Sequence, residues 1–277
     1  IKLISKIEMP SKRPIGVFDS GIGGLSILKA LRAELPHESF IYIADSGNAP
    51  YGEKGDAFVI ERSRAITRTL INDYGVKAMV VACNTATAAA AKVLRDEFPK
   101  LPLVGVEPAL KPAIRLSQTR KIGVIATRGT LESAKFAALK ESLAHQADFI
   151  IQPCDGLASA IEAQDATKII ALLASYMPAI GQFGIENCNV DTLVLGCTHY
   201  PFISQLLRQY TGDAVHIIDT GEPVALHTKR ILANLNQLTD ETQTGRLQLL
   251  STGPARHHTL LAHEWLNVPN QFEMITI

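Results

Sequence analysis

The chain has 277 residues, 47% hydrophobic and 19% charged, a composition typical of a globular protein with a large buried core. Its 27 basic and 27 acidic residues balance, so the overall charge favours neither nucleic acid nor an anionic membrane as a partner. Four cysteines without a Cys-x-x-Cys spacing argue against a disulfide scaffold and a cysteine-rich zinc site, and we expect a reducing, cytoplasmic location.

The first segment, residues 1–13, is polar and is expected to be an N-terminal extension outside the fold, with Met9 as the expected natural start. No apolar run approaches the roughly 20 residues that a membrane-spanning helix needs. We therefore expect no membrane partner.

From Pro14 onward, short apolar runs alternate with helical patterns. In the first half, strands are predicted at 14–19, 40–45, 78–83 and 101–106. A glycine-rich turn at 20–24 follows the first strand, and an alanine-rich helix is predicted from about Thr87 to Phe98. Strand and helix patterns in alternation predict an α/β fold with parallel sheets flanked by helices.

The pattern restarts after Pro108. Strands are predicted at 122–127, 149–152, 192–196 and 215–219, and helices at 156–164 and 167–180. The two Ile-Gly-Val strands lie 107 residues apart, and Cys83 and Cys197 lie 114 apart. This near-constant offset predicts two similar halves related by a pseudo-twofold axis, with a site in the cleft between them.

The end of the chain is too short for a third domain. After 215–219 it shows a helix, a strand near 247–251 and a short helix, which we expect to pack against the first half. The predicted domains are therefore residues 14–107 with 222–277, and residues 108–221.

The glycine turn permits a nucleotide interpretation. Gly21-Ile22-Gly23-Gly24-Leu25-Ser26 is close to Gly-x-Gly-x-x-Gly, and Asp45 follows about 20 residues later, where a ribose-binding acid would lie. Against this, Asp19 stands directly before the turn and would face the pyrophosphate. The alternative is that the glycines let the strand turn sharply into its helix. An NAD-linked oxidoreductase is thus a minor alternative.

Two cysteines are the strongest candidates for chemistry. Cys83 and Cys197 each end a buried strand and are followed by hydroxyl side chains and a helical pattern. In α/β proteins ligands bind at such strand ends, and backbone N–H groups at a helix start favour a thiolate. We interpret Cys154 and Cys188 as small buried hydrophobic residues.

Several side chains could assist these thiols. His199 is placed to exchange a proton with Cys197, and Asp19 and Asp45 end neighbouring strands where either could assist Cys83 or bind an ammonium group. Glu162 is either a solvated helix residue or part of the site. Tyr51, between Pro50 and Gly52, either lines a pocket or only packs against neighbouring side chains.

Four motifs resemble those of glutamate racemases and occur in the same order. They are Asp19-Ser20-Gly21-Ile22-Gly23-Gly24, Pro50-Tyr51-Gly52, Cys83-Asn84-Thr85-Ala86 and Gly196-Cys197-Thr198-His199-Tyr200-Pro201. The resemblance covers nearly the whole chain from Pro14 onward. Aspartate racemases share the two-cysteine plan but usually have glutamate after the second Cys-Thr, so His199 favours glutamate.

The resemblance implies interconversion of L- and D-glutamate without a cofactor or a metal, supplying D-glutamate for peptidoglycan. It assigns Cys83 and Cys197 as the two acid–base groups, assisted by Asp19 and His199 respectively. The substrate contacts that it implies, besides Asp19, are Ser20, Tyr51, Gly52, Asn84, Thr85, Thr127, Thr130 and Thr198. Asp45 and Glu162 match two auxiliary acidic positions. Family members are often homodimers.

The chain departs from the family at Cys154-Asp155-Gly156, where proline usually follows the cysteine, which leaves the role of Glu162 open. Besides aspartate racemisation and the oxidoreductase, a two-lobed small-molecule binding protein with inert thiols remains an alternative.

Overall fold

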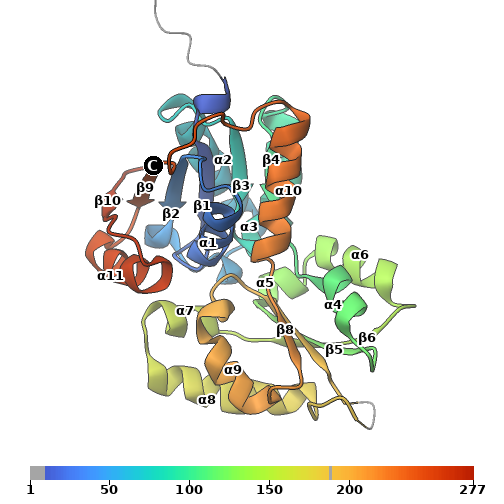
Figure 1. The fold of residues 1–277 in the computed structure, drawn as a ribbon. Helices are drawn as coiled ribbons and strands as arrows, with labels where there is room; N and C mark the ends of the chain where they lie inside the picture. Colours follow the sequence, from blue (N-terminus) through green and yellow to red (C-terminus); the bar gives the residue numbers. More distant parts are fainter. Residues whose placement is uncertain (1–9, 187–188) are drawn as a thin grey trace, which may run out of the picture.

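The computed structural model describes residues 10–186 and 189–277. Within these residues the chain forms two separate parallel sheets, one above the other in Figure 1, with helices on both faces of each. The predicted α/β class is confirmed. Residues 1–9 and Cys188, which was predicted to be a buried hydrophobic residue, lie outside the described residues.

The upper sheet has six strands in the order β10-β9-β2-β1-β3-β4. Their bounds are β1 Ile15–Asp19, β2 Phe40–Ala44, β3 Ala78–Val81, β4 Leu103–Gly105, β9 Leu247–Ser251 and β10 Phe272–Met274. All neighbouring pairs are parallel. Both faces of β1 and β3 are buried, which explains why these strands are continuously apolar instead of alternating.

The lower sheet has four parallel strands in the order β6-β5-β7-β8. Their bounds are β5 Lys121–Ala126, β6 Asp148–Pro153, β7 Thr192–Gly196 and β8 His216–Ile218. This order is the same as β2-β1-β3-β4 in the upper sheet, so β3 and β7 occupy equivalent positions. Cys83 and Cys197 follow these two strands, as the constant offset predicts.

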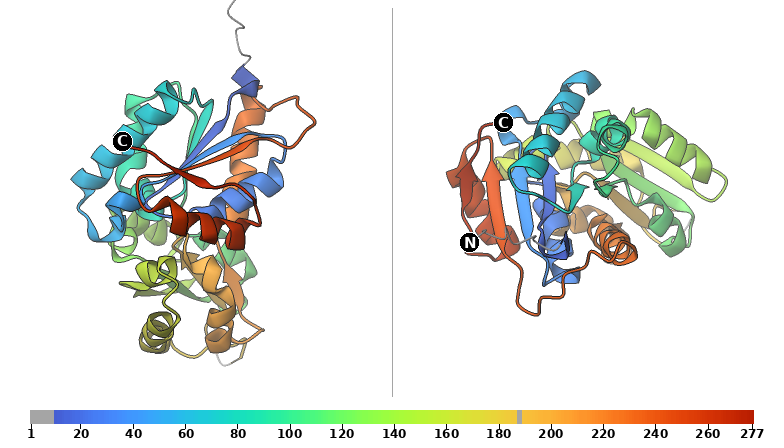
Figure 2. Two further views of the ribbon diagram at one scale, coloured as in Figure 1. Left: turned by 90° about the vertical axis from the view of Figure 1, so that its left-hand side faces the viewer. Right: turned by 90° about the horizontal axis from the view of Figure 1, so that it is seen from above.

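Helices enclose both sheets in three-layer arrangements (Figures 1 and 2). Around the upper sheet the α-helices are α1 Leu25–Glu34, α2 Asp56–Asn72, α3 Asn84–Glu97, α10 Gly221–Asn234 and α11 Ala255–Leu266. Buried residues of α1, α10 and α11 form one core with the sheet, and those of α2 and α3 form another on the opposite face.

Around the lower sheet the α-helices are α4 Leu110–Leu116, α5 Arg128–Leu131, α6 Ala134–Leu143, α7 Leu157–Glu162, α8 Ala166–Tyr176 and α9 Ser204–Thr211. The 3-10 helices of the described residues are η1 Pro10–Lys12, η2 Ser46–Asn48, η3 Tyr51–Glu53, η4 Met177–Ile180 and η5 Tyr200–Ile203. The core on one face includes α7, α8 and α9, and that on the other includes α4 and α6.

The C-terminal chain returns to the upper sheet. β9 pairs with β2, and β10 extends the sheet by pairing with β9. Strand β10 was not predicted, because Phe272–Met274 is three residues long and shows no period of its own. The exact domain bounds, including those in the C-terminal segment, stay a prediction.

Two helix bounds differ from the predicted ones. The helix expected from Thr87 begins at Asn84, because Cys83 itself caps it: its Sγ accepts a hydrogen bond from the N–H of Ala86 at 3.4 Å. The helix expected to run to Ile180 ends at Tyr176 and continues as a 3-10 helix, since Pro178 lacks the N–H that an α-helix would need there.

The glycine turn is where the lower half meets the upper one. A Cβ atom at Gly23 would overlap the ring of His199, with Cγ and Cε1 both within 2.6 Å, and one at Gly21 would overlap the carboxylate of Glu162. Neither glycine has a positive φ. Close approach of these two side chains, and not the sharpness of the turn, therefore requires glycine here.

We predict that Gly23→Ala destabilises the fold by about 1–3 kcal/mol, the usual cost of overpacking a filled site. Thermal unfolding measures it. Gly55→Ala is the matched control, because a Cβ there meets nothing within 4 Å and the φ of −71° suits alanine. Equal melting temperatures for the two variants would show that the ring of His199 leaves room for a Cβ atom at Gly23.

Candidate active site

A cavity of about 340 Å³ lies between the carboxyl ends of the two sheets. Its lining residues follow β1, β2, β3 and β9 in the upper sheet and β5, β6 and β7 in the lower one. The volume is within the range of about 300–1,000 Å³ typical of small-molecule sites. Of the predicted residues, it brings together Asp19, Ser20, Tyr51, Gly52, Cys83, Asn84, Thr85, Thr127, Glu162, Cys197, Thr198 and His199. Thr130 and Asp45 do not line it.

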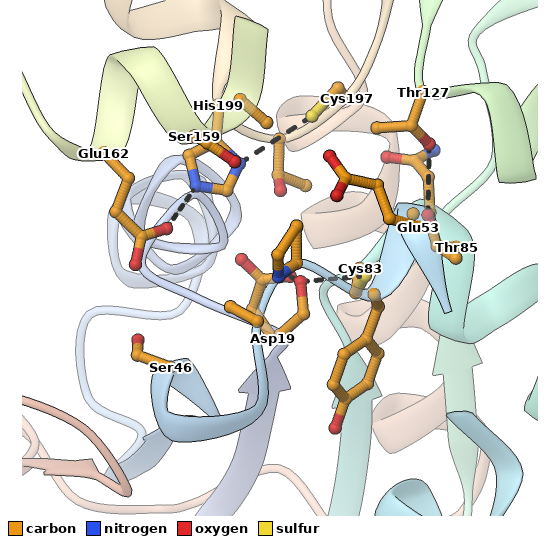
Figure 3. A pocket seen from close by; sticks show the side chains of 18 of the residues that line it. Asp19, Ser46, Glu53, Cys83, Thr85, Thr127, Ser159, Glu162, Cys197 and His199 are labelled. Atoms are coloured by element: carbon orange, nitrogen blue, oxygen red, sulfur yellow. Dashed lines mark hydrogen bonds and ion pairs between the residues drawn. The ribbon is translucent and has the colours of Figure 1, made fainter. Parts of the chain in front are cut away.

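The two thiols enter the cavity from different sheets. In Figure 3, Cys197 and His199 lie in the upper part of the view, and Cys83 and Asp19 lie in the lower part. Both cysteines are buried, and both are free thiols. Equivalent positions in two similar sheets thus place one thiol from each half against the same space.

Cys83 is linked to Asp19 through Ser20. The Sγ of Cys83 lies 3.5 Å from Oγ of Ser20, which in turn lies 3.5 Å from Oδ1 of Asp19. The other oxygen of Asp19 accepts the N–H of Gly24 at 2.7 Å. The carboxylate is therefore fixed by the glycine turn and reaches the thiol by way of a hydroxyl group.

The surroundings of Cys83 disfavour its thiolate. Burial, and after it the negative charge of Asp19, raises the pKa of this thiol, although the N–H of Ala86 and the hydrogen bonds of Ser20 lower it. The helix-start contribution predicted from the sequence is present, but desolvation outweighs it. Burial also raises the pKa of Asp19, opposed by the charge of His199.

Cys197 belongs to a chain of three groups. Nδ1 of His199 lies 3.7 Å from Sγ of Cys197, and Nε2 of the same ring lies 2.8 Å from Oε2 of Glu162 (Figure 3). Because the carboxylate accepts the Nε2 proton, Nδ1 is free to exchange a proton with the thiol. Glu162 is therefore a member of the site and not a solvated helix residue.

This arrangement favours the imidazolium form of His199. Burial lowers the pKa of His199, but the interactions with Cys197 and Glu162 outweigh burial and raise that pKa well above its ordinary value. Burial likewise raises the pKa of Glu162, yet the hydrogen bond and charge of His199 hold it below its usual range. A positive ring thus faces the sulfur of Cys197.

Three threonines join the halves on the other side of the cavity. The hydroxyl of Thr85, on α3, lies 3.1 Å from that of Thr127 and 3.4 Å from that of Thr130, and the latter two are 2.9 Å apart. Thr130 thus acts by holding the two that line the cavity. Asn84 is 94% buried beside them, and neither polar atom of its side-chain amide has a hydrogen-bond partner among the described residues. This amide is available to a ligand.

Asp45, predicted to assist Cys83 or bind an ammonium group, does not line the cavity, and that role stays a prediction. Asp45 is buried away from the cavity lining. Its two carboxylate oxygens accept hydrogen bonds from Nε and Nη2 of Arg62 at 3.0 and 2.8 Å. It also accepts the hydroxyl of Tyr51 at 2.5 Å. Tyr51 therefore presents its ring and backbone to the cavity, and Asp45 fixes the loop that carries it.

Other residues of the lining were not predicted. They include Ser46, Glu53, Cys154, Ser159, His257 and His258. Cys154 directly follows β6, so the strand-end rule that selected Cys83 would have found it; burial, chiefly, raises its pKa to about 12, and it stays a thiol. The two histidines carry no comparable signal, because α11 reaches the cavity through tertiary packing alone.

The glycine turn does not offer its N–H groups to a phosphate. The N–H of Ile22 points to Oε2 of Glu162 at 3.4 Å, and that of Gly24 donates to Asp19. Two carboxylates thus occupy the positions where a pyrophosphate would bind, which argues against the nucleotide interpretation.

Among the described residues, no three His, Cys, Asp or Glu side chains are grouped so as to hold a metal ion. None of the helices described is both long and apolar enough to cross a membrane.

Comparison with known proteins identifies the family of the chain. The family model of Asp/Glu/hydantoin racemases matches residues 25–228. The chain is 48% identical to the glutamate racemase of Ectopseudomonas mendocina over 248 residues, which cover 89% of this chain and 88% of that protein. It is 46% identical to that of Stutzerimonas stutzeri over 255 residues, covering 91% and 94%.

Solved structures of glutamate racemases share the fold. The enzyme of Bacillus anthracis superposes with a TM-score of 0.86 at 29% identity, covering 96% of this chain and 98% of that one. The Francisella tularensis enzyme in complex with D-glutamate gives a TM-score of 0.81 at 28% identity, with the same coverage. With the family model matching most of its length and curated relatives nearly half identical, the chain belongs to the Asp/Glu/hydantoin racemase family and is an amino-acid racemase, an isomerase.

Proposed function

We propose that this protein interconverts L- and D-glutamate by proton transfer at the α-carbon, with Cys83 and Cys197 as the two bases. The observation that carries the proposal is the pair of free thiols that follow equivalent strands and line one cavity from its two halves. The relatives named glutamate racemase support the substrate.

Racemisation needs one thiolate and one thiol on opposite faces of the substrate. Starting from L-glutamate, the Cys197 thiolate takes the α-proton, and the Cα–H electron pair remains on carbon. The Cys83 thiol then gives its proton to the other face, which forms D-glutamate and leaves Cys83 as the thiolate. D-Glutamate follows the same steps in reverse. No electron is gained or lost by the protein.

The surroundings of the two cysteines suit the protonation state that the reaction from L-glutamate requires, with a thiolate at Cys197 and a thiol at Cys83. The imidazolium of His199, held by Glu162, stabilises a negative sulfur at Cys197. Burial and the charge of Asp19 favour the protonated form of Cys83. Ser20 lies between Cys83 and Asp19 and can pass a proton from one to the other when the reaction runs from D-glutamate.

Hydroxyl and amide groups around the thiols would hold the substrate. Asn84, Thr85, Thr127 and Thr198 line the cavity next to Cys83 or Cys197 and can bind the carboxylates and meet the charge that develops at the α-carbon. We include Ser20, Asp19, Tyr51 and Gly52 as contacts, and Thr130 as a support for Thr85 and Thr127.

The cellular role follows from the reaction. D-Glutamate would serve peptidoglycan synthesis and so the biogenesis of the cell wall and cell shape. Three free cysteines in the described residues suit a reducing cytoplasm. The resemblance to the family further leads us to propose a homodimer, which light scattering on a size-exclusion column would test.

The first test is incubation of the purified protein with L-glutamate in D₂O without added cofactor. We expect α-proton exchange together with loss of optical rotation, unchanged by a chelator. L-Aspartate, one methylene shorter, is the comparison substrate. Faster exchange with aspartate would replace the proposed substrate, and activity that a chelator abolishes and a metal restores would refute the cofactor-independent mechanism.

The second test replaces each thiol. We expect Cys83→Ala and Cys197→Ala each to lower kcat by about 10⁴-fold, the upper end of what one positioned acid–base group contributes. Neither thiol can serve both faces. Cys154→Ala is the control, because Cys154 lines the same cavity but has no assigned role. Near-normal activity in either folded variant of the catalytic pair would exclude the two-base mechanism.

The third test assigns the assisting groups to faces. The enantiomers have equal free energy in water, so kcat/KM falls equally in both directions and cannot make the assignment. We expect Asp19→Asn to raise the primary α-deuterium isotope effect with D-glutamate, whose proton Cys83 removes, but not with L-glutamate. His199→Asn should give the opposite pattern. If both variants shift both directions alike, Asp19 and His199 only position the substrate.

A further inference from the structure

The C-terminal helix α11 reaches across to the lower half and contacts Glu162 with two consecutive histidines. Nε2 of His257 lies 2.8 Å from the main-chain oxygen of Glu162, and Nε2 of His258 lies 3.7 Å from Oε1 of its carboxylate. Figures 1 and 2 show α11 lying along the boundary between the halves, beside α7. Both the backbone and the side chain of Glu162 are thus held from the C-terminal segment.

His258 is fixed in one orientation. It is 98% buried, and its Nδ1 lies 3.0 Å from Oγ of Ser251. That hydroxyl accepts the N–H of Gly253 at 3.0 Å and can still donate its own proton to Nδ1, while Nε2 faces the Glu162 carboxylate, which can only accept. Neutral His258 therefore carries its proton on Nε2, which faces Glu162. The ring of Phe272, edge-on with centroids 5.6 Å apart, packs against the imidazole.

The two oxygens of Glu162 have different partners. Oε2 faces His199 at 2.8 Å and the N–H of Ile22 at 3.4 Å, and Oε1 faces His258. Hydrogen bonds fix Oε2, and the N–H of His258, whose nitrogen lies 3.7 Å from Oε1 and so beyond hydrogen-bond distance, restrains the carboxylate electrostatically in the same orientation. The only side chain that the structure describes within ion-pair distance of Oε1 is that of His258, so this restraint depends on it.

We propose that His258 is a positioning residue for the Cys197 half of the site: it orients the Glu162 carboxylate, which keeps the Nε2 proton of His199 and leaves Nδ1 facing the sulfur. This proposal rests on the proposed function, because it assumes that Cys197 works as a base. His258 acts through Glu162 and takes no proton from the substrate.

The test is His258→Leu, which removes the N–H but keeps an apolar side chain in the buried position. We expect kcat to fall about 10-fold with KM little changed. This is the lower end of the loss that follows removal of a group that orients a catalytic side chain. His258→Gln, which keeps an N–H donor, should recover much of the loss. His263→Leu, on an exposed position of the same helix, is the matched control and should leave kcat unchanged.

The isotope effect separates positioning from a general loss of structure. His258→Leu should raise the α-deuterium effect with L-glutamate but not with D-glutamate, as His199→Asn does. In a Glu162→Gln background the same substitution should have no further effect, because the group it orients is gone. Wild-type kcat in His258→Leu, or equal isotope shifts in both directions, would overturn the proposal.

A readout without turnover distinguishes this failure from failure of the proposed function. Alkylation by iodoacetamide, followed peptide by peptide with mass spectrometry, should be slower at Cys197 in His258→Leu and unchanged at Cys83. If the wild-type protein does not racemise glutamate, the function is wrong, yet selective slowing at Cys197 would still support the positioning role.

If His258→Leu does not fold, His258→Asn takes its place, because asparagine is polar but too short to reach Glu162. Equal alkylation rates in variant and wild type would refute the role.

Discussion

The position of the two halves around the cavity depends on the contact of Glu162 and His199, from the lower half, with the backbone of the glycine turn in the upper half. The side chains from the lower half can come this close only where the upper half has no Cβ atom, at Gly21 and Gly23. The hydroxyl of Ser26, on α1, donates to the main-chain oxygen of Thr198 at 2.8 Å and ties the same boundary. On the far side of the cavity the threonine hydroxyls make the second tie. Two contacts on opposite sides thus set the separation of the thiols.

The halves are alike in topology but not in chemistry. Cys83 and Cys197 follow equivalent strands, which places each at a strand end against shared space. Their partners differ: an imidazole backed by a carboxylate faces Cys197, whereas a hydroxyl and an anionic carboxylate face Cys83. The second set disfavours a thiolate at Cys83, and the first places a positively charged ring against the sulfur of Cys197. A two-base reaction needs such a difference at rest, because it begins with one thiolate and one thiol.

The C-terminal segment connects the two halves around the site. It adds β9 to the upper sheet, then places α11 beside α7, and returns to the sheet as β10. Ser251, at the end of β9, and His258, on α11, both belong to this segment, and together they lead to Glu162. Strand β9 therefore leads, through Ser251 and His258, to a carboxylate that the lower half supplies.

The sequence by itself determined the class of fold, the two parallel halves and the strand ends that carry Asp19, Cys83 and Cys197, because apolar runs, glycines and strand-end polar residues are local signals. It also indicated His199, from its place beside Cys197, and Glu162, through resemblance. Only the tertiary structure decided that Asp45 serves Arg62 and Tyr51 and lies away from the cavity, and that burial outweighs the helix start at Cys83. It also placed His258 against Glu162. These outcomes depend on which distant segments exclude water from a group or supply its charge partner, and no local pattern encodes that.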